Sequence, residues 1–353
     1  KADYGETQNF YGLSKVSFNN FFFDKSMLKE YASLTLMAEM GLPTPQFGLA
    51  RLYINDAYYG VYFMVENLDD SILKQYYGVG GEALSSYLCK PENTSFLYGE
   101  ILADPSPLWE EDDDTYEDVA DMIPTVTEWV RRLNCLSSGT DFDGNSLDVN
   151  SDEYLELLDT IMDTDEAVRY FAVHSWLCQM DNMFDGKKNF GLYVDPDGRS
   201  LLIPWDYDLS FGCFFPSTPE RTANYDLDLM FKDEWIYDSF GFGGRQKARY
   251  SSAEEVYQNY PLFHVIYQND SLMQSYHAYM KDVSRIAALG GLVESTQTYY
   301  DPGYLYRLIE TISEDLIEAA REETAENVYY MNHITQPSGV ISALPNLEKI
   351  IAM

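Results

Sequence analysis

Histidine and cysteine are scarce in this chain, which has four of each among 353 residues. The cysteines lie far apart and none forms a Cys-x-x-Cys pair, so the sequence predicts neither a zinc site nor a disulfide framework. The histidines form no His-Glu-x-x-His motif, and a zinc hydrolase or a histidine-dependent triad therefore has little support. We interpret His174, which lies in an apolar segment, as a core or supporting side chain and not as a catalytic base.

Basic residues are also few, and the chain is strongly acidic. Lysine and arginine number 23 against 58 aspartates and glutamates, which gives a formal net charge of −35. Such a field repels nucleic acids and anionic membrane surfaces, and it favours cationic partners. Acidity of this kind fits an extracellular or cell-surface location; no signal-peptide pattern opens the sequence, so an export signal would lie outside these residues.

Long apolar runs are absent, although apolar residues are plentiful. No stretch approaches the roughly 20 apolar residues that span a bilayer, so the sequence predicts no transmembrane helix. Hydrophobic residues make up 46% and aromatic residues 15%, which is enough for a packed globular core. Because 353 residues exceed what one hydrophobic core usually holds, we expect two lobes.

Helical and strand patterns both occur, so the sequence predicts an α+β fold. The expected elements are a strand at 13–18, a helix at 26–40, a hairpin that turns at 55–56, a helix at 124–133, a helix at 163–180 and helices from 257 onward. Asp24 or Ser26 can cap the first of these helices. Asp163 and Glu166 resemble a capping box at the start of the helix at 163–180.

A predicted hairpin near the middle of the chain is surrounded by four polar side chains, Asp181, Asn189, Asp206 and Asp208. Asp181 follows the apolar helical segment, and Asn189 opens the strand NFGLYV. A turn at 195–198 leads into the strand SLLIPW, which ends at Asp206. An aspartate that receives a hydroxyl proton, with carboxylate and amide oxygens that hold Mg²⁺, is what phosphoryl transfer requires.

Three other interpretations stay open on the pattern alone. The first is a loop and hairpin with solvated acids, which a chain with 58 acidic residues readily produces. The second is a glycosidase with Asp181 and Asp206 as its carboxylate pair. The third is a non-catalytic surface module that binds carbohydrate or protein, and the 30 tyrosines and 5 tryptophans favour it.

The hairpin resembles that of the CotH (spore coat protein H) family of atypical kinases in Asp181, Asn189 and Pro204-Trp205-Asp206. Residues 21–73 and 88–92 are similar to earlier blocks of the same family, in the same order. Two positions depart from the family pattern. Lys25 stands where the family usually has proline, and Lys188 stands where it often has histidine.

The resemblance implies a bilobal, atypical protein-kinase-like fold. Residues 1–95 would form a small β-rich lobe with one helix, and residues 161–353 a larger, mainly helical lobe that carries the catalytic loop and the metal-binding hairpin. Residues 96–160 would form an acidic connecting region, in which Glu110–Asp114 is a run of acids.

The resemblance also implies a secreted or surface protein kinase that transfers the γ-phosphate of ATP to serine or threonine with Mg²⁺ or Mn²⁺. Asp181 would be the catalytic base, and the metal ligands would be Asn189, Asp206 and Asp208. The residues implied for binding the nucleotide are Lys15, Glu30, Glu66 and Lys90. Glu30 would pair with one of the two lysines to face the phosphates, and Glu66 would lie near the adenine. The net charge of −35 adds the expectation that the protein substrate is basic around the acceptor.

Overall fold

The structure is a computed structural model that describes residues 10–13, 15–22, 24, 26–78, 87–108, 123–179, 181, 183, 187–211 and 251–322. Lys25, the acid run Glu110–Asp114 and the expected helical segment beyond residue 322 lie outside these ranges. The strands are β1 (Val16–Asn19), β2 (Phe47–Ile54), β3 (Ala57–Glu66), β4 (Tyr87–Cys89), β5 (Phe190–Val194), β6 (Ser200–Pro204), β7 (Gly291–Val293) and β8 (Thr298–Tyr300). The α-helices are α1 (Lys29–Glu39), α2 (Asp70–Tyr77), α3 (Tyr98–Ala103), α5 (Ile123–Ser137), α6 (Asp152–Asp159), α7 (Thr164–Trp176), α10 (Ala253–Gln258), α11 (Pro261–Tyr267), α12 (Asp270–Ser284) and α13 (Tyr304–Arg321).

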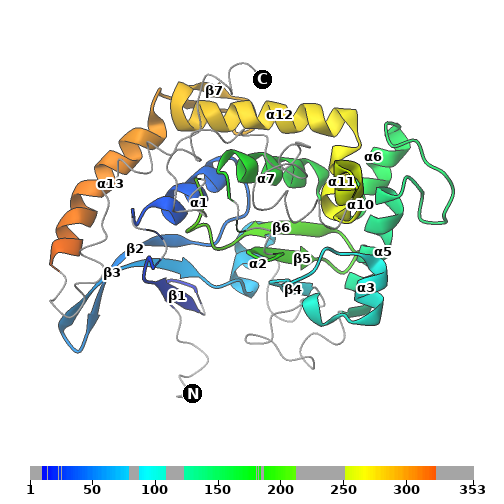
Figure 1. The fold of residues 1–353 in the computed structure, drawn as a ribbon. Coiled ribbons are helices and arrows are strands. Elements are labelled where there is room, and N and C mark those ends of the chain that lie inside the picture. The colour runs from blue at the N-terminus through cyan, green and yellow to red at the C-terminus, as the bar shows by residue number, and fades with distance from the viewer. Residues whose placement is uncertain are drawn as a thin grey trace.

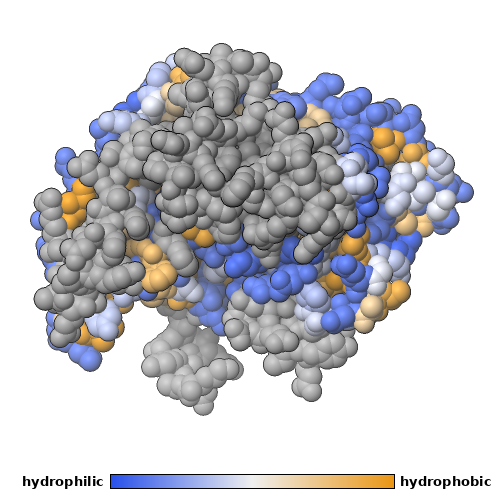
Figure 2. Space-filling view, in the orientation of Figure 1, coloured by the Kyte–Doolittle hydropathy of each residue, from blue (hydrophilic) through white to orange (hydrophobic). Residues whose placement is uncertain are grey.

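The described elements form a mixed α+β arrangement in layers, as predicted. In Figure 1, the strands of the two larger sheets lie below α1 and α7, and α12 lies above α7. No helix in the described ranges has the length and apolarity that a membrane crossing requires. In Figure 2, hydrophilic residues dominate the described part of one face, and the hydrophobic residues there form small separate groups.

The first sheet is antiparallel and has the strand order β1-β3-β2. β2 and β3 are joined across Asn55 and Asp56, whose φ angles of 50° and 64° are both positive, as a type I′ hairpin turn requires. The predicted hairpin is therefore confirmed. The strand expected at 13–18 occupies Val16–Asn19 and pairs with β3.

The carboxylate of Asp24 binds backbone N–H groups at the start of helix α1. The N-cap residue is Leu28, which makes no side-chain capping bond, so the predicted cap at Asp24 or Ser26 is not at the N-cap position. The carboxylate of Asp24 nevertheless accepts hydrogen bonds from the backbone N–H groups of Ser26 (2.9 Å) and Lys29 (2.7 Å), and it thereby satisfies the first N–H of the helix. The helix starts at Lys29 and not at Ser26, because Met27 has a positive φ of 61° that a helix does not allow. It ends at Glu39, shortly before Gly41, whose φ of 75° stops the helix.

The second sheet has the order β4-β5-β6 and contains the hairpin that the sequence predicts. Asp195 organises its turn, because the Oδ1 atom accepts hydrogen bonds from the backbone N–H groups of Asp197 (2.9 Å) and Arg199 (2.8 Å). Every residue of β5 and β6 is buried. A Cβ at Gly191 would lie 2.7 Å from the end of the Leu68 side chain and 3.2 Å from Cβ of Ile203, so any other residue there would have to displace Leu68. Pairing of β4 with β5 brings residues 87–89 beside the hairpin.

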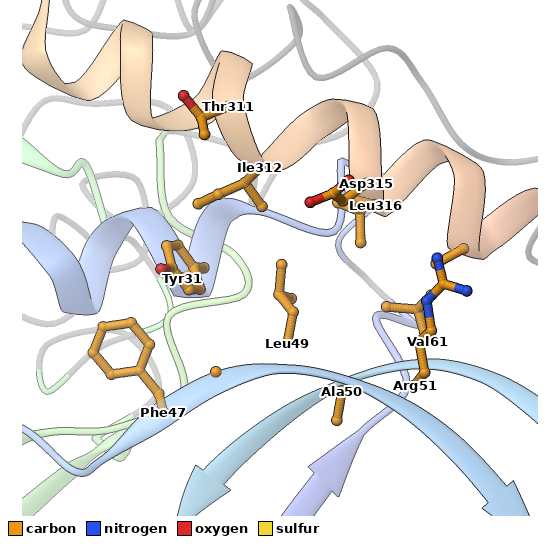
Figure 3. A pocket seen from close by; sticks show the side chains of 12 residues that line it. Tyr31, Phe47, Leu49, Ala50, Arg51, Val61, Thr311, Ile312, Asp315 and Leu316 are labelled. Atoms are coloured by element: carbon orange, nitrogen blue, oxygen red, sulfur yellow. The ribbon is translucent and has the colours of Figure 1, made fainter.

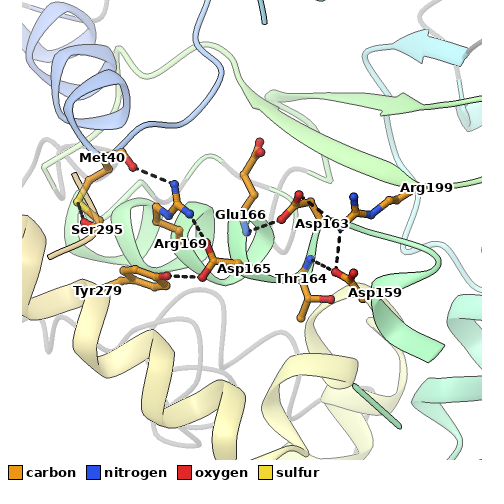
Figure 4. Close-up of polar contacts among 10 residues, drawn as sticks. All are labelled: Met40, Asp159, Asp163, Thr164, Asp165, Glu166, Arg169, Arg199, Tyr279 and Ser295. Carbon is orange, nitrogen blue, oxygen red and sulfur yellow. Dashed lines mark hydrogen bonds and ion pairs between the residues drawn. The ribbon is translucent and has the colours of Figure 1, made fainter. Parts of the chain in front are cut away.

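Helix α7 supports the hairpin from one side, and Arg169 connects it to two other helices (Figure 4). The Nη1 atom of Arg169 donates to the carbonyl oxygen of Met40, at the end of α1, at 3.2 Å. The guanidinium also pairs with Asp165 and lies over the ring of Tyr279, on α12, with a distance of 5.4 Å to the ring centroid. Arg169 therefore connects α1, α7 and α12.

One continuous hydrophobic cluster runs through the parts that were expected to form separate lobes. It includes Phe63 of the first sheet, Leu36 of α1, Phe171 of α7, Val283 of α12 and Leu305 of α13. The proposed boundaries at residues 95 and 160 therefore remain predictions. The expectation of only helices from residue 257 onward is wrong in one place, because β7 and β8 form a two-stranded sheet there.

The capping box predicted at the start of α7 forms only in its first half. The carboxylate of Asp163 accepts a hydrogen bond from the backbone N–H of Glu166 at 3.1 Å. The backbone N–H of Asp163 donates instead to Ser200 of β6, and Figure 4 shows the carboxylate of Glu166 pointing away from Asp163. The Oε1 atom of Glu166 is buried without a hydrogen-bond partner. Burial, with the negative charge of Asp163 nearby, raises the pKa of Glu166 to about 8.

We expect Glu166→Gln to stabilise the protein more at pH 8.5 than at pH 5. Between the ordinary pKa of 4.5 and the folded-state pKa of about 8, the folded state holds a proton on Glu166 that the unfolded state has released. The free energy of unfolding of the wild type therefore falls as the pH rises through this window, whereas a glutamine does not titrate. After allowance for partial solvent exposure, the gain at pH 8.5 should be about 1 to 2 kcal/mol.

Urea unfolding at pH 5, 6.5 and 8.5, followed by tryptophan fluorescence, measures this difference. Glu314→Gln is the matched control, because Glu314 is exposed on α13 and its loss should leave the pH trend of the wild type in place. An equal change in stability at all three pH values for Glu166→Gln would contradict the prediction.

Candidate active site

A cavity of about 410 Å³ lies between the end of β1, the start of α1 and the segment that follows β6. Its walls include the aromatic side chains of Phe21, Phe22 and Trp205. Four carboxylates also line it, and these are Asp24, Glu30, Asp206 and Asp208. Because apolar walls weaken the screening of charge by water, the carboxylates strongly favour a cation in this cavity.

Asp206 and Asp208 face the cavity because of the way the chain leaves β6. Tyr207, between them, is fully buried, and its hydroxyl lies 2.7 Å from the Nδ1 atom of His174. The backbone of Asp206 has a positive φ of 58°, which is unusual for a residue other than glycine. The side chain of Gln179 holds it in place, since its Nε2 atom donates to the carbonyl oxygen of Asp206 at 2.7 Å.

The two aspartates line the same cavity, and the charge of Asp206 acts on Asp208. Burial and the charge of Asp206 raise the pKa of Asp208 to about 7. Burial and the charge of Asp181 raise the pKa of Asp206. These shifts show that the negative charge of the cluster is not neutralised by the protein alone.

Glu30 belongs to the same cluster, and the predicted ion pair with Lys15 or Lys90 is not formed. Its side chain is 6% exposed, and burial together with the charges of Asp206 and Asp208 raises its pKa well above the ordinary value. The reason is the direction of α1, whose first turn points Glu30 toward the segment after β6. Lys15 lies exposed before β1, outside this cluster.

Lys29 is a member of the site that the sequence analysis did not identify. It is 7% exposed, and its Nζ atom lies 3.4 Å from Asp24 Oδ1 and 3.3 Å from the carbonyl oxygen of Asp208. A hydrogen bond of 2.8 Å between Ser33 and Ser210 ties the same two segments together. The signal in the sequence is a lysine in the first turn of a helix, where the dipole disfavours it and a tertiary partner must stabilise it.

Asp181 lies in the segment between α7 and β5, next to Lys188 and Asn189. The Nζ atom of Lys188 is 3.8 Å from Asp181 Oδ2, and the charge of Lys188 also acts on Asp206. The Nδ2 atom of Asn189 donates to the backbone carbonyl of Asp181 at 2.9 Å, which leaves the amide oxygen as a potential metal ligand. The structure therefore brings Asp181, Asn189 and Asp206 together around the hairpin.

The other residues expected to bind a nucleotide are placed differently. Lys90 follows β4 and lies over the ring of Trp205, 5.2 Å from the centroid, where its charge lowers the pKa of Asp206 against the effect of burial. Glu66 is 1% exposed; one carboxylate oxygen accepts from the backbone N–H of Gln46 at 2.8 Å and the other from the hydroxyl of Ser71. These contacts join the end of β3 to the residue before β2 and to α2, and both carboxylate oxygens of Glu66 are engaged by them.

His174 fits the supporting role predicted for it. It is 1% exposed, and burial lowers its pKa to about 3, so the ring is neutral. Its contact with Tyr207 lies beneath the two cavity-facing aspartates. His174 therefore contributes to the support of this segment and is too deeply buried to reach a substrate.

The donor set fits a hard divalent cation. Among the described residues, no group of three His, Cys, Asp or Glu side chains forms a ready cage for a metal ion. Mg²⁺ commonly binds to only one or two protein carboxylates and takes its other ligands from phosphate and water. Asp206 and Asp208, on the cavity wall, would offer carboxylate oxygens to such a cation, and Asn189 would supply an amide oxygen.

A second cavity of about 380 Å³ lies between the first sheet and α13 (Figure 3). Leu49 of β2 and Ile312 of α13 point toward each other across it, and Tyr31 of α1 closes one side. Its charged lining residues are Arg51 and Asp315. Because it has one carboxylate and mostly apolar walls, it lacks the ligands that phosphate chemistry requires.

The chain is similar to known proteins over the range that contains the candidate site. The family described as CotH kinase protein matches residues 1–288, a range that contains all the candidate residues from Lys15 to Asp208. Inner spore coat protein H of Bacillus subtilis (strain 168) is 24% identical over 217 residues, which cover 59% of this chain and 52% of that protein. The chain thus spans about half the length of the curated relative it matches.

Proposed function

The chain belongs to the CotH kinase protein family, and from this we propose that it is an atypical protein kinase that transfers the γ-phosphate of ATP to serine or threonine side chains, with Mg²⁺ or Mn²⁺ as the cofactor. We further propose a bilobal kinase-like fold and an extracellular or cell-surface location. The observation that best supports the activity is the pair Asp206–Asp208, which faces an aromatic-walled cavity close to Asp181.

Each residue of the site has a defined part in this proposal. A bound Mg²⁺ or Mn²⁺ would neutralise the charge of the triphosphate. Asp206 and the amide oxygen of Asn189 would hold that cation, with Asp208 as a further ligand. Asp181, at the edge of the cluster, would orient the acceptor hydroxyl and receive its proton. Trp205, with Lys90 over its ring, would form a wall beside the nucleotide.

The structure also supports a revision of the nucleotide contacts. Since Glu30 lies among carboxylates, it would act on the metal side of the site and not as the partner of a phosphate-binding lysine. Lys29, held between Asp24 and the carbonyl of Asp208, would balance part of the negative charge of the cluster. Lys15 and Lys90 stay candidates for contact with the phosphates.

The charge of the protein indicates which residues surround the acceptor in the substrate. At a net charge of −35, with three carboxylates near the entering hydroxyl, the protein attracts basic peptides and repels acidic ones. We therefore propose that acceptor serines and threonines lie among lysines and arginines. Lys187 and Lys188 border the cleft, and their positive charges would favour acidic peptides instead.

A peptide array with radiolabelled ATP tests both the activity and the substrate. With Mg²⁺ or Mn²⁺, we expect labelling of serine and threonine peptides, with a preference of about tenfold for those flanked by basic residues. Raising the salt from low to physiological concentration should reduce that preference because ions screen the field.

Two results would count against these proposals. A preference for Asp/Glu-flanked acceptors that salt does not change would show that the lysines at the cleft, and not the overall charge, select the substrate. If neither metal supports labelling of any peptide, phosphotransfer is excluded, and binding of carbohydrate or protein by a non-catalytic surface module becomes the better interpretation.

A further inference from the structure

Lys188 occupies a position that the proposed kinase chemistry has not yet used. Its ammonium group lies 3.8 Å from Asp181 Oδ2, and it is the residue directly before Asn189, whose side chain bonds to the carbonyl of Asp181, so it lies beside the proposed base. The side chain is 42% exposed, so it can move without a change in the core.

The backbone around Lys188 is bent to present it there. Lys187 and Asn189, on either side, both have positive φ angles, of 54° and 64°. Such angles are uncommon for residues with side chains, and they persist where the surrounding structure compensates for them. Asn189 is fixed by its hydrogen bond to the carbonyl of Asp181, and Lys187 lies 5.9 Å from the ring centroid of Tyr260. The loop therefore directs Lys188 toward the cleft.

We propose that Lys188 is a catalytic residue that binds the γ-phosphoryl group of ATP and stabilises it during transfer; this inference rests on the proposed function. With no nucleotide bound, Lys188 is held by Asp181. When the γ-phosphate enters between Asp181 and the metal ligands, the ammonium group turns to the phosphoryl oxygens, and the Asp181 carboxylate becomes available to the acceptor hydroxyl.

The acceptor oxygen forms a bond to the γ-phosphorus, and its proton passes to Asp181. The bond between the γ-phosphorus and the oxygen that bridges it to the β-phosphorus breaks, and ADP leaves with the electron pair. Lys188 changes no bond in this step; it compensates the negative charge on the equatorial oxygens of the transferred group.

Lys188→Met tests the proposal through the difference between ATP and ADP, because only ATP carries a γ-phosphate. By titration calorimetry with Mg²⁺, we expect the Kd of ATP to rise about tenfold while the Kd of ADP stays unchanged. The kcat for peptide phosphorylation should fall about 10²- to 10³-fold. Lys188→Arg should recover most of the ATP affinity, since arginine also donates to phosphate.

Lys281→Met is the control, because it removes the same charge from an exposed position on α12 outside the cavity and should leave both nucleotide affinities as in the wild type. If Lys188→Met weakens ATP and ADP equally, or transfers phosphate at the wild-type rate, the inference is overturned while the kinase proposal stands. If the wild type binds ATP no better than ADP and transfers no phosphate, both are overturned.

Discussion

Asp206→Asn should reduce phosphotransfer by about 10³-fold or more while the protein stays folded. An amide keeps the shape of the side chain but removes the charge that a divalent cation needs. The backbone should tolerate the change, because asparagine adopts the positive φ of this position more readily than most residues. Removal of one of several mutually repelling carboxylates should leave the unfolding temperature without ligand at or above that of the wild type.

Thermal unfolding with ATP separates loss of the metal from loss of the fold. In the wild type, Mg²⁺ should increase the stabilisation that ATP provides, and in Asp206→Asn that increase should disappear. Asp197→Asn is the matched control, since Asp197 is an exposed carboxylate in the turn of the same hairpin and should retain activity. Activity of Asp206→Asn at the wild-type level would refute its assignment as a metal ligand.

The parts of the site that sequence could predict are those governed by local signals. Asp195 and Gly198 make a turn through their own backbone and side-chain preferences, so the hairpin and its ends at Asn189 and Asp206 follow from nearby residues. Asn55 and Asp56 likewise tolerate the positive φ angles that their turn needs. Where a turn and two apolar strands determine the geometry, the prediction is confirmed.

The partner of Glu30 could not be predicted because it depends on contacts between distant segments. Residues 206–208 are brought to the first turn of α1 by Lys29 and by the hydrogen bond between Ser33 and Ser210, which are 177 residues apart. An acid beside a buried helical stripe signals only that some cation or proton must neutralise it. The sequence analysis chose a lysine, whereas the structure places Asp206 and Asp208 there.

The sequence could not show which lobe each strand belongs to, for a similar reason. The family resemblance and the order of the chain place the segment at 87–92 in the small lobe, yet β4 pairs with β5 of the hairpin and Lys90 lies over Trp205. Strand pairing between segments about 100 residues apart leaves no periodic signal in either of them. Chain order alone therefore does not show which lobe a short strand joins.

In the proposed mechanism, Asp181 serves the acceptor side of the reaction, and it lies at the edge of the cluster and not among the residues that line the cavity. Its carboxylate faces Lys188, and its backbone is held by Asn189. A carboxylate in this position can orient a hydroxyl and take its proton, but it is not needed to hold the nucleotide. Asp181 should therefore contribute to the chemical step much more than to ATP affinity.

Asp181→Ala should lower kcat for peptide phosphorylation by about 10²- to 10⁴-fold and leave the stabilisation by ATP and Mg²⁺ largely in place. Single-turnover transfer to a peptide measures the first quantity, and thermal unfolding with the nucleotide measures the second. Asp143→Ala is the control, because Asp143 is an exposed carboxylate in a loop outside the cavity and should change neither. If nucleotide binding and transfer fall in parallel in Asp181→Ala, Asp181 must be reassigned to the ligands of the metal, next to Asp206.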